Sequence, residues 1–90
     1  MVDPARLADL LDDYRTALLT HRERVEEGFT RTRDAYRRIE GYDWQAAQEF
    51  RSRFERSAAA FDAYVTGTRG LLSLLEERID ALRELARTQL

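Results

Sequence analysis

The sequence predicts an all-α fold, an antiparallel two-helix hairpin that dimerises into a four-helix bundle. Apolar residues recur in steps of three and four along almost the whole chain, which is the period of an amphipathic helix. The pattern breaks strongly only once, at Gly41-Tyr42-Asp43. With 90 residues the chain is predicted to form one domain, residues 1–90, with a small core. We expect helix 1 over about 4–40, a turn at 41–43 and helix 2 over about 44–89.

The first helix is predicted to begin at Asp3-Pro4. Asp is a good N-cap, and Pro suits the first helical position because its missing N–H would have no partner there anyway. The opposite face of this helix is polar or charged, so it presents one apolar stripe and one solvated face. The stripe consists of apolar or small residues that step by four and three: Leu7, Leu11, Tyr14, Leu18, His21, Val25, Gly28, Thr32, Ala35 and Ile39.

The turn and the second helix follow from Gly41 and Asp43. Gly is the preferred residue just past a helix C-terminus, and Asp43 is predicted to be the N-cap of the next helix. Gly67 and Gly70 interrupt the second helix at about 1 kcal/mol each relative to Ala, and we expect one continuous helix with a close helix approach or a local bend there. Its stripe reads Phe50, Phe54, Ala58, Phe61, Val65, Thr68, Leu72, Leu75, Ile79, Leu82 and Ala86.

The stripe of the second helix is too wide for one neighbour. Tyr64, Leu71 and Leu85 widen it on one side. Two rods touch along one line only, so part of a stripe three positions wide would stay exposed as a large apolar patch. A second hairpin would cover that patch. The predicted hairpin or dimer core is Leu11, Leu18, Val25, Phe54, Phe61, Val65, Leu72, Leu75 and Ile79.

Enzymatic and metal chemistry find no support in the residue types present. The chain has no Cys and one His, which excludes disulfides, thiolate metal sites and multi-histidine metal sites within one chain. Leu18 stands three residues before His21, so the Glu-x-x-His motif of di-iron bundles is absent. We therefore expect no catalytic, cofactor or metal site. His21 is interpreted as a buried or half-buried packing residue with one hydrogen bond, or as part of a pH-sensitive interface.

The charge pattern and the hydropathy limit the kinds of partner that the chain is expected to bind. The net charge of −2 combines both signs along the whole chain. The densest basic cluster is interleaved with acidic residues, so a solvated face is favoured over nucleic-acid binding; it comprises Arg31, Arg33, Arg37 and Arg38, with Asp34 and Glu40. No run approaches the roughly 18 apolar residues of a membrane span. The start at Met1 lacks the layout of a secretory signal, so we expect a cytoplasmic protein or export by a signal-peptide-independent route.

Trp44 is the only Trp, and it stands beside the turn. One interpretation is that it caps the open end of the hairpin by packing across both helices, with its N–H bonded to a nearby acceptor. The alternative adds recognition, because an aromatic residue at the tip of a bundle is well placed to meet a partner.

The segment Trp44-Gln45-Ala46-Ala47-Gln48-Glu49-Phe50, just after a turn between two helices, resembles the WXG family of type VII (ESX) secretion proteins, the early-secreted-antigen-like proteins. That family has Trp-x-Gly in the turn of a helical hairpin of about this length, with an aromatic residue about six positions after the Trp. Ala46 stands where the family has Gly. The family's export signal, Tyr-x-x-x-Asp/Glu after the second helix, is missing: Tyr64 is followed by Thr68, and only Tyr36-x-x-x-Glu40 has that spacing, before the turn.

The resemblance implies a small, non-enzymatic, dimeric export substrate or adaptor. Its partners would be a second copy of itself or a paralogous WXG-like protein, together with the type VII secretion ATPase. Trp44, Ala46 and Phe50 would form the partner-binding turn motif. The alternative is a cytoplasmic helical interaction or structural dimer that is unrelated to secretion.

Overall fold

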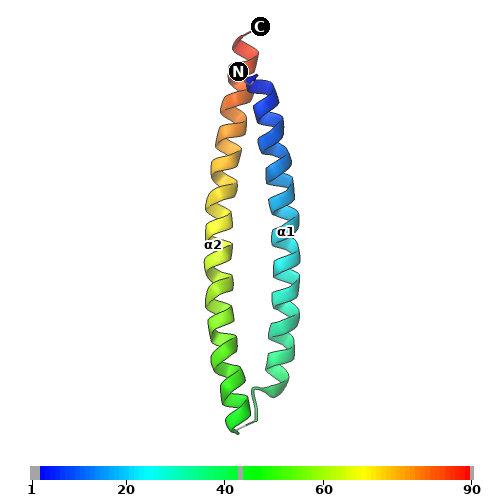
Figure 1. Ribbon diagram of the computed structural model, residues 1–90, viewed down its shortest axis with the longest axis vertical. Helices are drawn as coiled ribbons and strands as arrows, with labels where there is room; N and C mark the ends of the chain where they lie inside the picture. The colour runs from blue at the N-terminus through cyan, green and yellow to red at the C-terminus, as the bar shows by residue number, and fades with distance from the viewer. Residues whose placement is uncertain (1–2, 43, 90) are drawn as a thin grey trace.

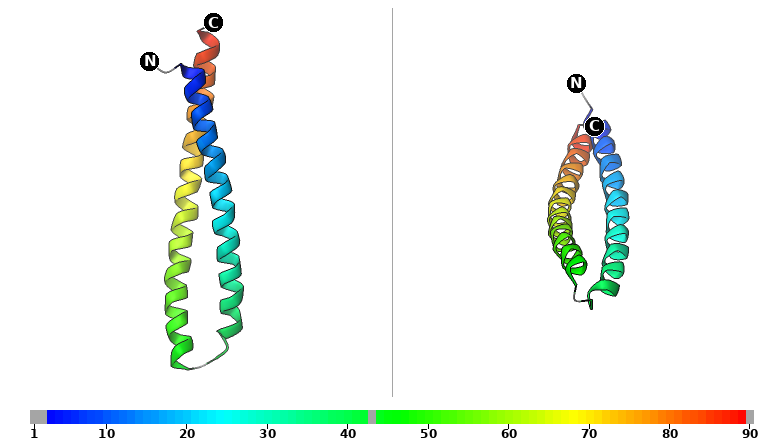
Figure 2. Two further views of the ribbon diagram at one scale, coloured as in Figure 1. Left: turned by 45° about the vertical axis from the view of Figure 1, so that its right-hand side comes forward. Right: turned by 60° about the horizontal axis from the view of Figure 1, so that its bottom comes forward.

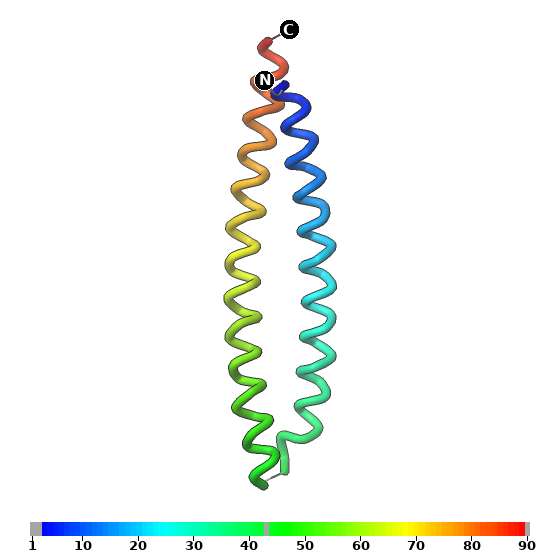
Figure 3. Tube along the Cα trace, viewed as in Figure 1, coloured from blue at the N-terminus to red at the C-terminus, as the bar shows by residue number. Residues whose placement is uncertain are grey.

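The computed structural model describes residues 3–42 and 44–89, and these residues form two long antiparallel helices, α1 (Pro4–Ile39) and α2 (Gln45–Thr88), that lie side by side (Figure 1). The molecule is a rod with extents of 69 × 18 × 16 Å. Both ends of the chain lie at one end of the rod and the turn lies at the other, as the trace in Figure 3 shows. The predicted all-α helical hairpin is confirmed.

The start of α1 follows the predicted cap. The Asp3 carboxylate accepts a hydrogen bond from the backbone N–H of Ala5 at 3.2 Å, and the Asp3 carbonyl accepts one from Leu7 at 3.0 Å. Pro4 occupies the first turn, where its missing N–H leaves nothing unpaired. The helix therefore begins where the Asp3-Pro4 signature predicted.

The turn differs from the prediction in its details. The backbone N–H of Tyr42 donates to the carbonyl of Ile39 at 3.1 Å, and no described glycine has a positive φ, so Gly41 does not form a left-handed cap. The predicted N-cap, Asp43, lies outside the described residues. The N-cap position of α2 is instead held by Trp44, with φ −141° and ψ 163°. The predicted bounds are thus off by one residue at Glu40, Trp44 and Gln89.

The seam between the helices is made of two stripes on each helix that repeat every seven residues, as in a coiled coil. On α1 the buried and half-buried members are Ala8, Arg15, Arg22, Phe29 and Tyr36, and Leu11, Leu18, Val25 and Ile39; Thr32, which falls at the same spacing between Val25 and Ile39, is exposed. On α2 they are Ala47, Phe54, Phe61, Thr68, Leu75 and Leu82, and Arg51, Ala58, Val65, Leu72, Ile79 and Ala86. Apart from Thr32, every one of these side chains is buried or half-buried, including the nine assigned to the core from sequence.

One stripe of α1 was assigned wrongly. Leu7, Tyr14, His21 and Ala35 were expected in the seam and are exposed, because α2 docks against the other side of the stripe. The residues that face α2 instead are those directly after them in the sequence, such as Arg15 after Tyr14 and Arg22 after His21. An Arg can hold such a position because its methylene stem packs while its charged head reaches water. Thr32 of α1 and Phe50 of α2 were also expected in the seam and are exposed, because a groove opens between the helices there.

The half of the hairpin that carries the chain ends holds most of the buried residues. Leu72, Leu75 and Ile79 are 8%, 6% and 3% exposed, and they share this half with the buried Ala8. Thr68 is buried beside them, and its hydroxyl donates to the Tyr64 carbonyl at 2.8 Å, which satisfies the polar group. In the left view of Figure 2 the helices cross at this end of the rod.

The half near the turn is held by a row of aromatic rings that alternate between the helices. Phe29 of α1 stacks on Phe61 of α2 with ring centroids 4.2 Å apart, and its other neighbour is Phe54 at 5.8 Å. Tyr36 continues the row against Phe54 at 4.1 Å. All three ring pairs are within 15° of parallel. Each aromatic pair contributes about 0.5–1.5 kcal/mol beyond the area it buries.

The glycines of α2 do not mark a close helix approach within the hairpin. The helix is continuous through Gly67 and Gly70, as predicted, but a Cβ added at either position would meet no atom within 4 Å. The expected close approach is therefore wrong for the single chain. Both glycines weaken α2 without a packing contact in return.

Replacing Gly70 with Ala is expected to raise the free energy of unfolding by about 0.5–1 kcal/mol. The added methyl group has open space, and Ala loses less backbone freedom than Gly when the helix forms. Urea denaturation followed by circular dichroism measures the change, with Ala63→Gly, at another exposed position of α2, as the reverse control. A loss of stability in Gly70→Ala would mean that this position is covered in solution.

Candidate partner-binding surface

A third heptad stripe on each helix stays outside the seam. On α1 it comprises Leu7, Tyr14, His21, Gly28 and Ala35, and on α2 Phe50, Ser57, Tyr64, Leu71 and Leu85, with Arg78 as its one charged member. In an antiparallel pair these stripes flank the seam on the same side, and the hydrogen bond between His21 and Tyr64 joins them across it. We call this surface the open face. A single hairpin leaves it largely uncovered.

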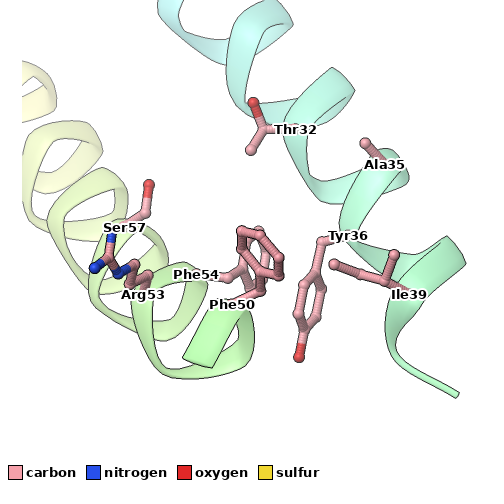
Figure 4. Close-up of a pocket in the computed structure, with 8 residues that line it drawn as sticks. All are labelled: Thr32, Ala35, Tyr36, Ile39, Phe50, Arg53, Phe54 and Ser57. Atoms are coloured by element: carbon pink, nitrogen blue, oxygen red, sulfur yellow. The ribbon is translucent and has the colours of Figure 1, made fainter. Parts of the chain in front are cut away.

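The open face is hollowed along the aromatic row. A groove of about 560 Å³ lies between Ile39 and Tyr36 of α1 and Phe50 and Phe54 of α2. A second hollow of about 370 Å³ continues it toward the middle of the rod and shares two lining residues with it, Thr32 and Ser57. In Figure 4 the two Phe rings project from α2 toward Tyr36 and Ile39. The groove therefore offers an apolar floor to a partner side chain.

His21 and Tyr64 occupy the middle of the open face. The Nδ1 atom of His21 lies 2.6 Å from the Tyr64 hydroxyl, and the two rings pack edge to face with centroids 5.8 Å apart. The predicted single hydrogen bond of His21 is present, but its expected burial is wrong because the side chain is exposed. The pair ties the helices together at the surface that a partner would cover.

The opposite side of the seam is charged. Arg83 of α2 reaches Asp12 of α1 at 3.3 Å, and Arg15 lies 3.0 Å from the same carboxylate. Near the turn, the Arg51 guanidinium donates to the Glu40 carbonyl at 3.3 Å. Exposed ion pairs such as Arg83–Asp12 and Arg15–Asp12 contribute about 0–1 kcal/mol each, so they orient the helices more than they stabilise them. The hairpin thus has one ion-paired face and one apolar face.

The residues of the turn motif fall into two places. Phe50 is 58% exposed and lines the groove. Trp44 is also 58% exposed, and its ring lies against Tyr42 with centroids 6.1 Å apart. One interpretation expected Trp44 to pack across both helices, but its one aromatic neighbour among the described residues is Tyr42, and more than half of the side chain stays exposed. Ala46 is exposed in the first turn of α2.

Several groove residues were missed by the sequence reasoning. Tyr36 was named only for its spacing to Glu40, Phe29 was not assigned to the seam, and Ser57 and Arg53 were assigned no part in a site. All four line the groove or the hollow that continues it. The sequence did contain a signal for Phe29 and Tyr36. They end a seven-residue series that begins at Ala8 and runs through Arg15 and Arg22, and such a series indicates a seam position. The two Arg residues concealed it, because a hydropathy pattern scores them as solvated.

Within residues 3–42 and 44–89, no group of three or more His, Asp or Glu side chains is arranged to hold a metal ion. Neither described helix contains a stretch long and apolar enough to cross a membrane. The surface features of the described chain are thus the open face, the ion-paired face and the exposed aromatic pair at the tip.

Comparison of this chain with protein-family models, with curated proteins and with solved structures gives no match.

Proposed function

We propose that this chain is a non-catalytic pairing protein whose open face is covered by a second helical hairpin, and that the resulting four-helix bundle is a substrate or adaptor of a type VII secretion system. The observation that carries the pairing is the open face, where both helices leave a heptad stripe of mainly apolar and small residues on one side, interrupted by His21, Ser57 and Arg78. The link to secretion rests on the resemblance of the segment Trp44–Phe50 to the WXG turn motif.

The surface area of the chain supports the pairing. The chain exposes 7132 Å², whereas a compact monomer of its mass, 10.6 kDa, exposes about 5,500 Å². The excess of roughly 1,600 Å² is about twice the roughly 800 Å² that each partner buries in an interface of standard size. A second hairpin on the open face would remove an area of this order from water.

The exposed tip supports a recognition role for Trp44. Its ring touches Tyr42 and remains 58% exposed, so the hairpin gains little stability from it. Exposed Trp residues are often the anchor of a protein interface because a large apolar ring is combined with one N–H donor. We propose that the secretion ATPase or another component of the export machinery binds here.

Trp44→Ala is expected to abolish export from a host with a type VII system, while helicity and pairing stay unchanged. Trp44→Phe is expected to reduce export less, since Phe keeps most of the apolar area but lacks the indole N–H. Immunoblotting of culture filtrate and cell lysate measures export, and circular dichroism with sedimentation measures the fold. Leu19→Ala, which truncates an apolar side chain that is 42% exposed and away from the tip, serves as the control. Normal export of both Trp44 variants would refute the recognition role.

The second candidate is a cytoplasmic structural dimer that uses the same open face. Two features favour it over export. Ala46 replaces the Gly of the motif, and Thr68 stands where an acidic residue would complete an export signal after Tyr64. Thr68 is moreover buried in the seam with its hydroxyl bonded to backbone. Absence of the parent chain from the culture filtrate of an export-competent host would favour this candidate.

A further inference from the structure

The groove and the hollow that continues it form one trough between α1 and α2. The groove holds about 560 Å³ and the hollow about 370 Å³, and Thr32 and Ser57 line both. On α2 the trough runs from Phe50 to Tyr64, which is about 21 Å at about 1.5 Å per residue. The trough is therefore elongated along the rod.

The walls of the trough are mostly apolar. Phe29 and Phe61 line the hollow, and Phe54 and Tyr36 line the groove. Between them the lining residues are small, and a Cβ added at Gly28 would meet no atom within 4 Å. Small-molecule sites typically hold about 300–1,000 Å³ and combine apolar and aromatic walls with a few polar groups that orient the ligand. The trough has both the size and the wall composition of such a site.

Arg53 supplies the charge. Among the described residues it is the one charged side chain that lines the groove, and no charged side chain lines the hollow. Within residues 3–42 and 44–89 no carboxylate forms an ion pair with Arg53, although Glu49 precedes it by one helical turn. Ser57 follows one turn later, and in Figure 4 both side chains project from the same side of α2. A guanidinium with a hydroxyl beside it matches a carboxylate, to which Arg can donate two parallel hydrogen bonds.

We propose that the trough binds one molecule of a long-chain fatty acid, with its carboxylate at Arg53 and its alkyl tail along the trough toward Tyr64. The elongated apolar walls fit a flexible tail, and the single cation selects an anionic head group. This inference goes beyond the proposed function and does not rest on it. Because the trough belongs to the open face, a bound fatty acid competes there with a partner hairpin.

Dodecanoate and dodecyltrimethylammonium test the choice of head group, because they carry opposite charges on the same alkyl tail. Isothermal titration calorimetry of the full chain, with each amphiphile below its micelle concentration, is expected to saturate at one dodecanoate per chain. The cation is expected to bind at least about tenfold more weakly, because like charges meet at Arg53. Equal binding of the two, or uptake of dodecanoate without saturation, would overturn the fatty-acid site and leave the trough to a partner hairpin.

Arg53→Gln tests the position of the head group. This variant is expected to bind the two amphiphiles about equally, because the cation that distinguishes them is gone. Arg56→Gln removes an exposed Arg that lies outside the groove and the hollow, and it is expected to keep the preference for dodecanoate. A preference that survives in Arg53→Gln would mean that Arg53 does not hold the carboxylate, contrary to the proposal.

Ser57→Trp tests the position of the tail. The indole ring would stand where the groove meets the hollow, whereas Ser52→Trp makes the same change at an exposed position outside both. We expect Ser57→Trp to bind dodecanoate at least about tenfold more weakly with unchanged helicity in circular dichroism, since an overfilled site has no room for the tail. Ser52→Trp is expected to bind as the parent chain does. Equal affinity of the two Trp variants for dodecanoate would exclude the trough as the site.

The fatty-acid site and the proposed function fail separately. A chain that binds dodecanoate with these preferences but never leaves an export-competent host supports the site and contradicts the secretion role. A chain that is exported but takes up no dodecanoate contradicts the site and supports the secretion role.

Discussion

Ile79→Ala is expected to lower the free energy of unfolding by about 2–5 kcal/mol, the largest loss expected for a single truncation in the end that carries the chain termini. Ile79 is 3% exposed, the lowest value among the large side chains of the described chain. Removing three carbons there costs their transfer from water and leaves a cavity that two long rods cannot easily close. A hairpin of this size has a total stability of only about 5–15 kcal/mol, so the variant is expected to be partly unfolded near 37 °C.

Urea denaturation at several protein concentrations measures this loss. Leu19→Ala is the matched control, because it removes the same number of carbons from a side chain that is 42% exposed. The control is expected to lower the free energy of unfolding by well under 1 kcal/mol, because surface substitutions usually change it by no more than about 0.5 kcal/mol. Equal losses in the two variants would mean that Ile79 is not a core residue in solution.

Phe29→Ala is expected to cost about 3 kcal/mol, the low end of the range for truncating a buried Phe, because the ring is half-buried rather than enclosed. The ring contacts both Phe54 and Phe61, so its removal breaks the aromatic row in the middle. Hydrogen exchange is expected to speed up between the turn and the middle of the rod, with the far end less affected.

Phe29→Leu separates stacking from volume. Leu keeps most of the buried apolar area but not the parallel ring contacts, and we expect it to recover more than half of the loss seen with Ala. If Leu and Ala cost the same, ring stacking carries the stability of this half. If Ala costs under 1 kcal/mol, the row does not hold the helices together.

Short-range sequence signals predicted where the helices and the turn lie. Which side of each helix is buried depends instead on how the two helices dock. The start of α1 followed from Asp3-Pro4, and the position of the turn followed from the break at residues 41–43. These are properties of neighbours in sequence, which a pattern reports directly. The side of the stripe that meets α2 is not such a property, because a stripe three positions wide allows two dockings, and Leu7 and Tyr14 were therefore placed wrongly.

The site was predicted only in part for the same reason. Phe50 was named as a partner-binding residue and lies in the groove, but Tyr36 and Thr32, which form the opposite wall, belong to a helix that a linear motif does not include. A groove between two helices depends on their relative register and rotation. Neither the register nor the rotation is determined by a single segment of the sequence.

The position of the buried residues bears on loop-closure entropy. The Asp12–Arg83 contact, near the chain ends, closes a loop with a sequence separation of 71, whereas Tyr36 and Phe54, near the turn, are 18 apart. Two doublings of loop length cost only about 1.2 kcal/mol, less than the loss expected from truncating Ile79 alone. Packing therefore outweighs chain connectivity in this hairpin. The end of the rod that carries the chain termini is therefore the more stable one. Thermal separation of the helices is expected to start at the end with the turn, where the groove lies.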